Sequence, residues 1–140
     1  MTFPSEPRRR AAVVGTGLIG GSIALALRKQ GWHVTGRDLA PQRAAQALEQ
    51  GALDAVGDDP AAEITFVCVP VSSIAEEARA ALAAGGVVTD VGGVKAPVVG
   101  AVDHPRFVGG HPMASRFSTG SSRPCRPRAT SSCWATARAC

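Results

Sequence analysis

Residues 13–22 of the chain read VVGTGLIGGS, a Gly-x-Gly-x-x-Gly turn that directly follows a short apolar segment and directly precedes a helix-like run. Each of its glycines has a physical role in a dinucleotide site. Gly15 permits the tight turn, and Gly17 lacks the Cβ that would keep a pyrophosphate away from the backbone. Gly20 lets the helix pack closely on the strand, so that its N–H groups face the phosphates.

An acidic residue, Asp38, follows Gly20 by eighteen positions, at the end of the next strand-like run, 33–37. This order of elements predicts a dinucleotide site, whereas a glycine turn without it would be an ordinary turn. The residues predicted to bind the cofactor are Gly15, Thr16, Gly17, Leu18, Ile19, Gly20 and Asp38. A carboxylate at position 38 can accept hydrogen bonds from a ribose 2′-hydroxyl, which favours NAD. Arg37 could instead pair with a 2′-phosphate, so NADP remains the alternative.

Strands and helices alternate up to about residue 112. We expect strands at 11–14, 33–37, 64–69, 87–90 and 106–108, a short element at 54–56, and helices at 18–30, 41–50, 73–84 and 94–100. The third helix is expected to open at Ser73, where Ser-Ile-Ala-Glu has the pattern of a capping box. The alternation predicts an α/β fold with a Rossmann-type doubly wound parallel sheet in a single domain.

Ligands of such sheets bind beyond the carboxyl ends of the strands. The glycine-rich and polar segments of this chain follow those ends, at 15–20, 38, 70–72, 92–95 and 109–112. Gly and Pro also mark turns of no functional importance. We expect one continuous cleft along this edge of the sheet.

Composition limits the other function classes. The chain has 140 residues and a net charge of +4, but residues 1–114 carry −1 and residues 115–140, with five Arg and no acid, carry +5. Because this tail lacks interleaved aromatic residues, its charge does not predict a nucleic-acid partner. No apolar run could span a membrane and residues 1–10 do not resemble a secretion signal, which favours a cytoplasmic protein. Cys68 fits a core position, and the spacing of Cys125, Cys133 and Cys140 predicts no metal site.

Four segments together, GTGLIGGS at 15–22, VPV at 69–71, DVGGVK at 90–95 and GGHPMA at 109–114, resemble the prephenate/arogenate dehydrogenase family of tyrosine biosynthesis. The resemblance covers about residues 10–114. It implies an enzyme that oxidises the ring hydroxyl carbon of prephenate or arogenate with NAD(P) while the ring carboxylate leaves as CO₂.

The resemblance also implies roles for individual residues. His111 would be the catalytic histidine, accepting the hydroxyl proton as hydride passes to the nicotinamide. Val69, Pro70 and Val71 would belong to the cofactor site, and Gly93 and Lys95 would lie near the substrate. Without the resemblance, His111 could be a loop residue before a proline, and Lys95 an exposed lysine at a helix start.

Two departures from the family pattern bear on activity. Gly93 occupies the family's serine position, which removes a hydroxyl. After Ala114 the family continues into a further strand and a helical dimer domain, whereas residues 115–140 contain no Leu, Ile, Val, Asp, Glu or Lys. We therefore predict an N-terminal extension at 1–10, a dinucleotide-binding domain at 11–114 and a disordered tail at 115–140. A shifted reading frame would explain the tail, and a genuine basic tail is the alternative. Three functions remain: a dehydrogenase, a monomeric cofactor-binding fragment without turnover, and another oxidoreductase of the same fold.

Overall fold

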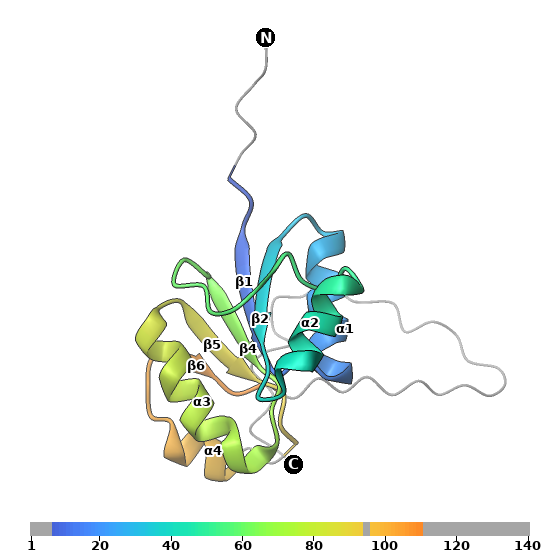
Figure 1. The fold of residues 1–140 in the computed structure, drawn as a ribbon. Helices are drawn as coiled ribbons and strands as arrows, with labels where there is room; N and C mark the ends of the chain where they lie inside the picture. The colour runs from blue at the N-terminus through green and yellow to red at the C-terminus, as the bar shows by residue number, and fades with distance from the viewer. Residues whose placement is uncertain (1–6, 94–95, 111–140) are drawn as a thin grey trace, which may run out of the picture.

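The computed structural model describes residues 7–93 and 96–110, and in these residues a six-stranded parallel sheet forms the centre of the molecule (Figure 1). Its strands lie in the order β3-β2-β1-β4-β5-β6. Their bounds are β1 Arg10–Val14, β2 His33–Arg37, β3 Ala55–Val56, β4 Ile64–Val67, β5 Val87–Asp90 and β6 Phe107–Val108. The direction of winding reverses between β1 and β4, so a crevice opens beyond the carboxyl ends of these two strands.

Four helices cover the two faces of this sheet. Figure 1 shows α1 (Leu18–Lys29) and α2 (Pro41–Glu49) on one face, and α3 (Val71–Ala84) and α4 (Ala96–Ala101) on the other. Each helix connects parallel strands, which is the crossover that such a sheet requires. The prediction of a Rossmann-type doubly wound fold is therefore confirmed for the described residues.

The core consists of two apolar clusters, one on each face. Val13, Val34 and Leu53 pack with alanines of α1 and α2 on one side. Val67 and Val88 pack with Ile74, Leu82 and residues of α4 on the other. Because successive side chains of a strand point to opposite faces, strands covered on both faces need apolar residues at nearly every position. This explains the unbroken apolar runs of β1 and β4.

Several boundaries differ from the sequence prediction by one or two residues, and the two clearest differences have an identifiable cause. β4 ends at Val67 although its apolar run continues to Val69, since its neighbour β1 ends at Val14 and turns away. Helix α3 begins at Val71 instead of Ser73, with Pro70 as its N-cap residue and no side-chain cap. The predicted capping box therefore lies inside the helix. The predicted helix at 94–100 is described as Ala96–Ala101, and residues 94–95 lie outside the described residues.

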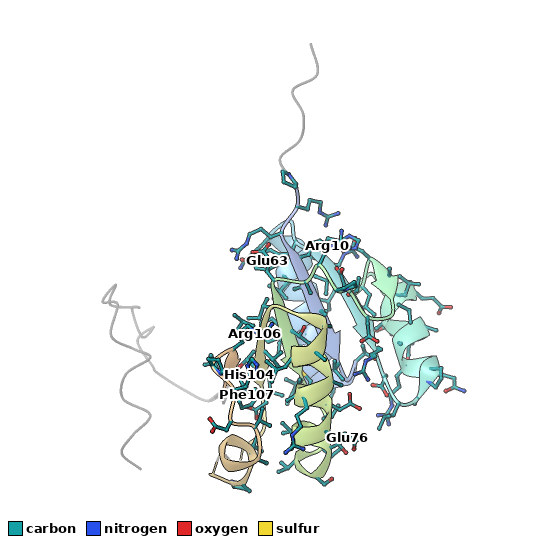
Figure 2. All side chains as sticks on the ribbon, turned by 90° about the vertical axis from the view of Figure 1, so that its left-hand side faces the viewer. Arg10, Glu63, Glu76, His104, Arg106 and Phe107 are labelled. Atoms are coloured by element: carbon teal, nitrogen blue, oxygen red, sulfur yellow. The ribbon has the colours of Figure 1, made fainter. Side chains whose placement is uncertain are left out.

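The amino ends of the strands are tied together by arginines that precede or begin β1. Arg10 donates to Asp59 at 2.7 Å, and Arg9 pairs with Glu63 at 3.1 Å and lies 4.1 Å from the ring centre of Trp32. Figure 2 shows Arg10 and Glu63 together at this edge, far from the carboxyl ends of the strands. The sheet thus begins one residue earlier than predicted, and Arg9 is already held against it.

The described residues contain no helix long and apolar enough to cross a membrane. Among the same residues, no three His, Cys, Asp or Glu side chains are grouped so that they could hold a metal ion.

Candidate functional site

The turn between β1 and α1 contains two glycines that the protein's own packing requires. Gly15 has a φ of +90°, and a Cβ on it would lie 2.4 Å from the carbonyl oxygen of Cys68. A Cβ on Gly20 would lie 1.9 Å from the carbonyl oxygen of Gly15. Neither distance is sterically tolerable, so these two glycines hold the turn tightly against the end of β4 and the start of α1.

Gly17, between them, has no such requirement. A Cβ at this position would meet no atom within 4 Å, and the residue has φ −72° and ψ −159°, an extended conformation open to any L residue. Neither packing nor backbone strain within the described residues therefore calls for glycine here. The space in front of Gly17 fits a group from outside the protein that approaches the backbone closely.

Helix α1 presents its amino end to the same space. Gly17 is its N-cap residue, no side chain caps it, and its first turn contains no acidic residue. The first α-helical hydrogen bond runs from the N–H of Gly21 to the carbonyl of Gly17 at 2.8 Å, so the N–H groups of Leu18 and Ile19 have no partner within the helix. An uncapped helix start with a positive dipole end is suited to an anion such as a phosphate.

Asp38 stands beside this turn and is bonded to it. Its Oδ2 accepts hydrogen bonds from the N–H of Thr16 at 2.8 Å and from the Thr16 hydroxyl at 3.3 Å, while its Oδ1 accepts from the N–H of Ala40 at 2.9 Å. Partial burial would raise the pKa of Asp38, but these bonds and the charge of Arg43 outweigh it and hold the pKa below its usual range. The side chain is therefore an anion at neutral pH, with a lone-pair site on Oδ1 left for a further donor.

The neighbouring cation, Arg37, lines the same cavity as Asp38, but its guanidinium is held by two other carboxylates. Its Nε donates to Asp58 at 2.7 Å and its Nη2 to Glu77 of α3 at 2.5 Å. The hydrogen bond to Glu77 is the main cause that raises the pKa of Arg37 above its ordinary value. Arg37 thus links β2 to α3 and to the loop between β3 and β4. That loop is a crossover between parallel strands that contains no helix.

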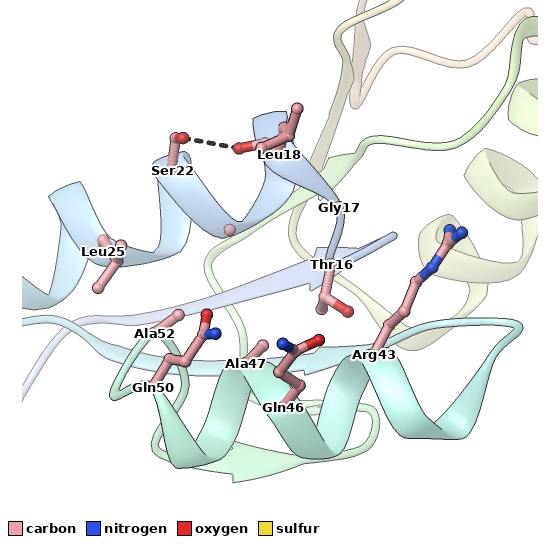
Figure 3. Close-up of a pocket in the computed structure, with 11 residues that line it drawn as sticks. Thr16, Gly17, Leu18, Ser22, Leu25, Arg43, Gln46, Ala47, Gln50 and Ala52 are labelled. Carbon is pink, nitrogen blue, oxygen red and sulfur yellow. Dashed lines mark hydrogen bonds between the residues drawn. The ribbon is translucent and has the colours of Figure 1, made fainter.

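Two hollows meet at the glycine turn. A cavity of about 250 Å³ lies at the carboxyl ends of β1, β2 and β4, and a groove of about 360 Å³ runs between α1 and α2. Gly17 and Arg43 line both. Figure 3 shows the Arg43 and Gln46 side chains rising from α2 toward the turn, with Thr16 beside them. The crevice that the topology predicts is therefore present, with a cation and an anion at its margin.

The predicted cofactor residues are distributed over both hollows. Gly15, Gly17, Asp38, Val69 and Pro70 line the cavity, and Thr16, Gly17 and Leu18 line the groove. Gly20 is buried beneath the turn, whereas Ile19 and Val71 are about half exposed and line neither hollow. The sequence analysis missed Arg43, for which the only signal was its position five residues after Asp38 in the first turn of a helix.

The carboxyl end of β5, the neighbour of β4 in the sheet, carries a buried carboxylate that was not predicted as a site residue from the sequence. Asp90 is 1 % exposed, and its two oxygens accept hydrogen bonds from the N–H groups of Gly92 at 2.9 Å and Gly110 at 3.1 Å. Burial raises the pKa of the Cys68 thiol to about 12, and the charge of Asp90 adds to this. Cys68 is therefore an unreactive thiol that packs against the core, as predicted.

The residues predicted to lie near the substrate, Gly93 and Lys95, follow β5 in the sequence. Gly93 is exposed, in the loop that follows β5. The predicted catalytic residue His111 and the predicted Lys95 lie outside the described residues. Gly110, which Asp90 holds, directly precedes His111 in the sequence.

Comparison with known proteins gives consistent matches. A family model described as prephenate dehydrogenase, nucleotide-binding domain, matches residues 23–124. Prephenate dehydrogenase of Bacillus subtilis is 35% identical over 124 residues, which cover 77% of this chain and 33% of that protein. A probable prephenate dehydrogenase of Streptomyces niveus is 34% identical over 119 residues, with 80% and 33% covered. The chain spans about a third of the length of these curated relatives.

Solved structures agree with the sequence matches. Prephenate dehydrogenase of Aquifex aeolicus, in complex with hydroxyphenyl propionate and NAD⁺, has a TM-score of 0.68 and 29% identity, covering 79% of this chain and 43% of that one. Arogenate dehydrogenase of Synechocystis has a TM-score of 0.66 and 30% identity, with 78% and 42% covered. Lactate dehydrogenase of Eimeria maxima, at 15% identity and a TM-score of 0.53, shares the fold alone.

Proposed function

The chain belongs to the prephenate dehydrogenase family, whose nucleotide-binding domain it matches, and from this premise we propose that it binds NAD(H) for the oxidation of prephenate or arogenate. The observation that carries the proposal is the empty space in front of Gly17, at the uncapped start of α1. A dinucleotide pyrophosphate fits both features, because it is anionic and must approach the backbone closely.

We infer that NAD(H) is preferred to NADP(H). The ionised carboxylate of Asp38 can accept hydrogen bonds from a ribose 2′-hydroxyl and would repel a 2′-phosphate. Arg37, the cation adjacent to it in sequence, is engaged by Asp58 and Glu77 and would have to give up both partners to bind that phosphate.

The test is a parallel titration of the purified chain with NADH and NADPH. We expect NADH to bind at least about tenfold more tightly, which corresponds to roughly 1.4 kcal/mol. Asp38→Ala should reduce the ratio of the NADH affinity to the NADPH affinity. Arg37→Gln is the matched control, since the loss of a cation that is already paired with Asp58 and Glu77 should leave the ratio of affinities unchanged. Tighter binding of NADPH by the unchanged chain would overturn the preference.

For the chemical step, we propose that His111 accepts the proton of the substrate hydroxyl while a hydride leaves the same ring carbon and the ring carboxylate departs as CO₂. The bound dinucleotide supplies the hydride acceptor. A histidine suits this step because its side chain titrates near neutral pH. The complex of the Aquifex aeolicus relative with hydroxyphenyl propionate and NAD⁺ supports a substrate of this class. Gly93 provides no hydroxyl to help hold the substrate.

A second candidate function is cofactor binding without efficient turnover. It concerns these 140 residues by themselves, which correspond to about a third of the length of the curated relatives and would offer the cofactor site without the remainder of such a protein. Hydride transfer requires donor carbon and acceptor at near-attack distance, and a misplacement of about 1 Å can cost roughly a hundredfold in rate. We expect the 140-residue polypeptide to be monomeric, to bind NADH and to oxidise prephenate and arogenate slowly. A steady-state assay with both substrates decides the matter: turnover at the rate of a complete family member would exclude this candidate.

A further inference from the structure

The buried carboxylate of Asp90 bonds to two segments of the chain that are far apart in sequence. One is the loop that follows β5, through the N–H of Gly92, and the other is the segment that follows β6, through the N–H of Gly110. Thr89 and Val108 are paired in the register of β5 and β6, so the two segments leave the sheet side by side. Asp90 therefore joins them directly beyond the strands.

Both N–H groups reach the carboxylate because their residues lack a Cβ. A Cβ on Gly110 would lie 2.5 Å from the carbonyl oxygen of Asp90 and 2.8 Å from the hydroxyl oxygen of Thr89. A Cβ on Gly92 would lie 2.6 Å from Cδ1 of Ile74. Gly110 thus packs against the end of β5 and Gly92 against Ile74 of α3, and this packing explains one glycine in each of the Gly-Gly pairs that the sequence contains there.

A carboxylate is better suited to this task than a neutral side chain. It has two equivalent acceptor oxygens, so each segment can donate to its own oxygen, and hydrogen bonds to a charged acceptor are stronger than neutral ones. An asparagine offers one acceptor oxygen and an NH₂ group that only donates, and would leave one glycine N–H facing that NH₂ group. Burial of a charge is tolerated only where such bonds compensate for lost hydration. The aspartate is therefore explained by the need to hold two segments at once.

The two segments that Asp90 holds lead into the residues assigned to the substrate. Gly92 directly precedes Gly93, and Gly110 directly precedes His111. We propose that Asp90 is a positioning residue, whose carboxylate fixes the spacing between the loop of Gly93 and the segment that carries His111. Its importance for catalysis rests on the proposed function, whereas the link itself does not.

The test uses nuclear magnetic resonance of the isotope-labelled 140-residue chain, with Asp90→Asn as the variant. We expect the amide protons of Gly92 and Gly110 to exchange with solvent about tenfold faster or more, since one or both lose a bond to a charged acceptor. We also expect the ring signals of His111 to shift, while those of His33 and His104 stay in place. A purely structural effect on the sheet would not select His111 among the three histidines.

Two controls make the result decisive. Asp103→Asn removes a carboxylate of the same kind from an exposed position after α4, and should leave the Gly92, Gly110 and His111 signals unchanged. If Asp90→Asn does not fold, Gly92→Ala replaces it. Its added Cβ would lie 2.6 Å from Cδ1 of Ile74 and 3.0 Å from Oδ2 of Asp90, so it must displace the link, and it should shift the same His111 signals although it is distant from His111 in sequence. A folded variant of either kind that leaves the His111 signals unchanged would overturn the proposal.

NADH titration of the same samples separates this proposal from the previous one. Failure of the unchanged chain to bind NADH would refute the proposed function but would leave the link between Asp90 and the two segments to be judged on the exchange and histidine data alone. Normal NADH binding together with an unshifted His111 in folded Asp90→Asn would refute the positioning role and leave the cofactor site standing.

Discussion

Replacement of Gly17 by valine tests the cofactor site at its most exposed point. An added Cβ meets no protein atom within 4 Å, and the extended conformation of residue 17 is one that valine adopts readily. The cost to folding is therefore that of a poor N-cap residue, about 1 kcal/mol. For a domain of this size that corresponds to a fall in Tm of about 4–8 °C.

The cost to cofactor binding should be much larger. A branched side chain at Gly17 would occupy the space in front of the N–H groups at the start of α1, and a pyrophosphate would lose contact with at least two of them. Hydrogen bonds to a charged group contribute about 1.5–3 kcal/mol each, so the loss is about 3–6 kcal/mol. The affinity for NADH should fall by roughly 10²- to 10⁴-fold.

The assay is NADH titration and thermal unfolding on the same preparations. Gly20→Ala is the contrasting variant, because its Cβ would lie 1.9 Å from a backbone oxygen and should lower Tm by about 10 °C or more. Gly100→Ala is the neutral control, since position 100 in α4 has open space around it and is remote from the turn. A folded Gly17→Val chain whose NADH affinity lies within twofold of the unchanged chain would refute the reasoning, and the cofactor would have to bind elsewhere.

Two further predictions concern stability. Burial would raise the pKa of Asp59, but hydrogen bonds from Arg10 and the N–H of Ala61 hold this pKa below its usual value. Folding therefore favours the ionised carboxylate. Its contribution to the free energy of unfolding is present above about pH 4 and is lost as the pH falls through the lowered pKa. Asp59→Asn should therefore lower Tm by several degrees at pH 7 and by progressively less as the pH is lowered below about 4, and a loss that stays constant over the acid range would contradict this linkage. A chain ending at Ala114 should have a Tm within a few degrees of that of the full chain, because residues 115–140 offer few apolar side chains to bury. Differential scanning calorimetry of both chains measures this difference. A larger fall in Tm would mean that residues 115–140 pack against the domain.

The fold was predictable because its signals are local. The Gly-x-Gly-x-x-Gly turn, the acid after the second strand and the apolar runs identify the elements one after another, and parallel topology follows from their alternation. Boundaries were less predictable where a neighbour decides them. The apolar run of β4 continues to Val69, but the strand ends when β1 leaves the sheet at Val14, a fact of pairing that the run itself does not contain.

In the candidate site, the glycine turn was predictable from the sequence, whereas the partners of the charged side chains were not. Arg37 follows a pattern that suits a 2′-phosphate, yet its partners Asp58 and Glu77 lie 21 and 40 residues further along the chain and become neighbours only in the folded sheet. Asp90 at a strand end resembles any aspartate before a turn. Its link to Gly110 depends on the pairing of β5 with β6, which brings together residues 20 positions apart.

These long-range pairings change how cofactor preference should be understood. If Arg37 were free, an anion and a cation would stand side by side at the end of β2, and the sequence alone would give no net preference. The bonds to Asp58 and Glu77 remove that cation from the balance and leave Asp38 facing the cavity. Arg43 is the cation that remains at its margin, and it acts on Asp38 from α2 by lowering the pKa of the carboxylate. The charge of Arg43 therefore favours the ionised form of Asp38, which accepts a hydrogen bond from a ribose 2′-hydroxyl. The same charge would attract a 2′-phosphate, but that phosphate would also be repelled by Asp38.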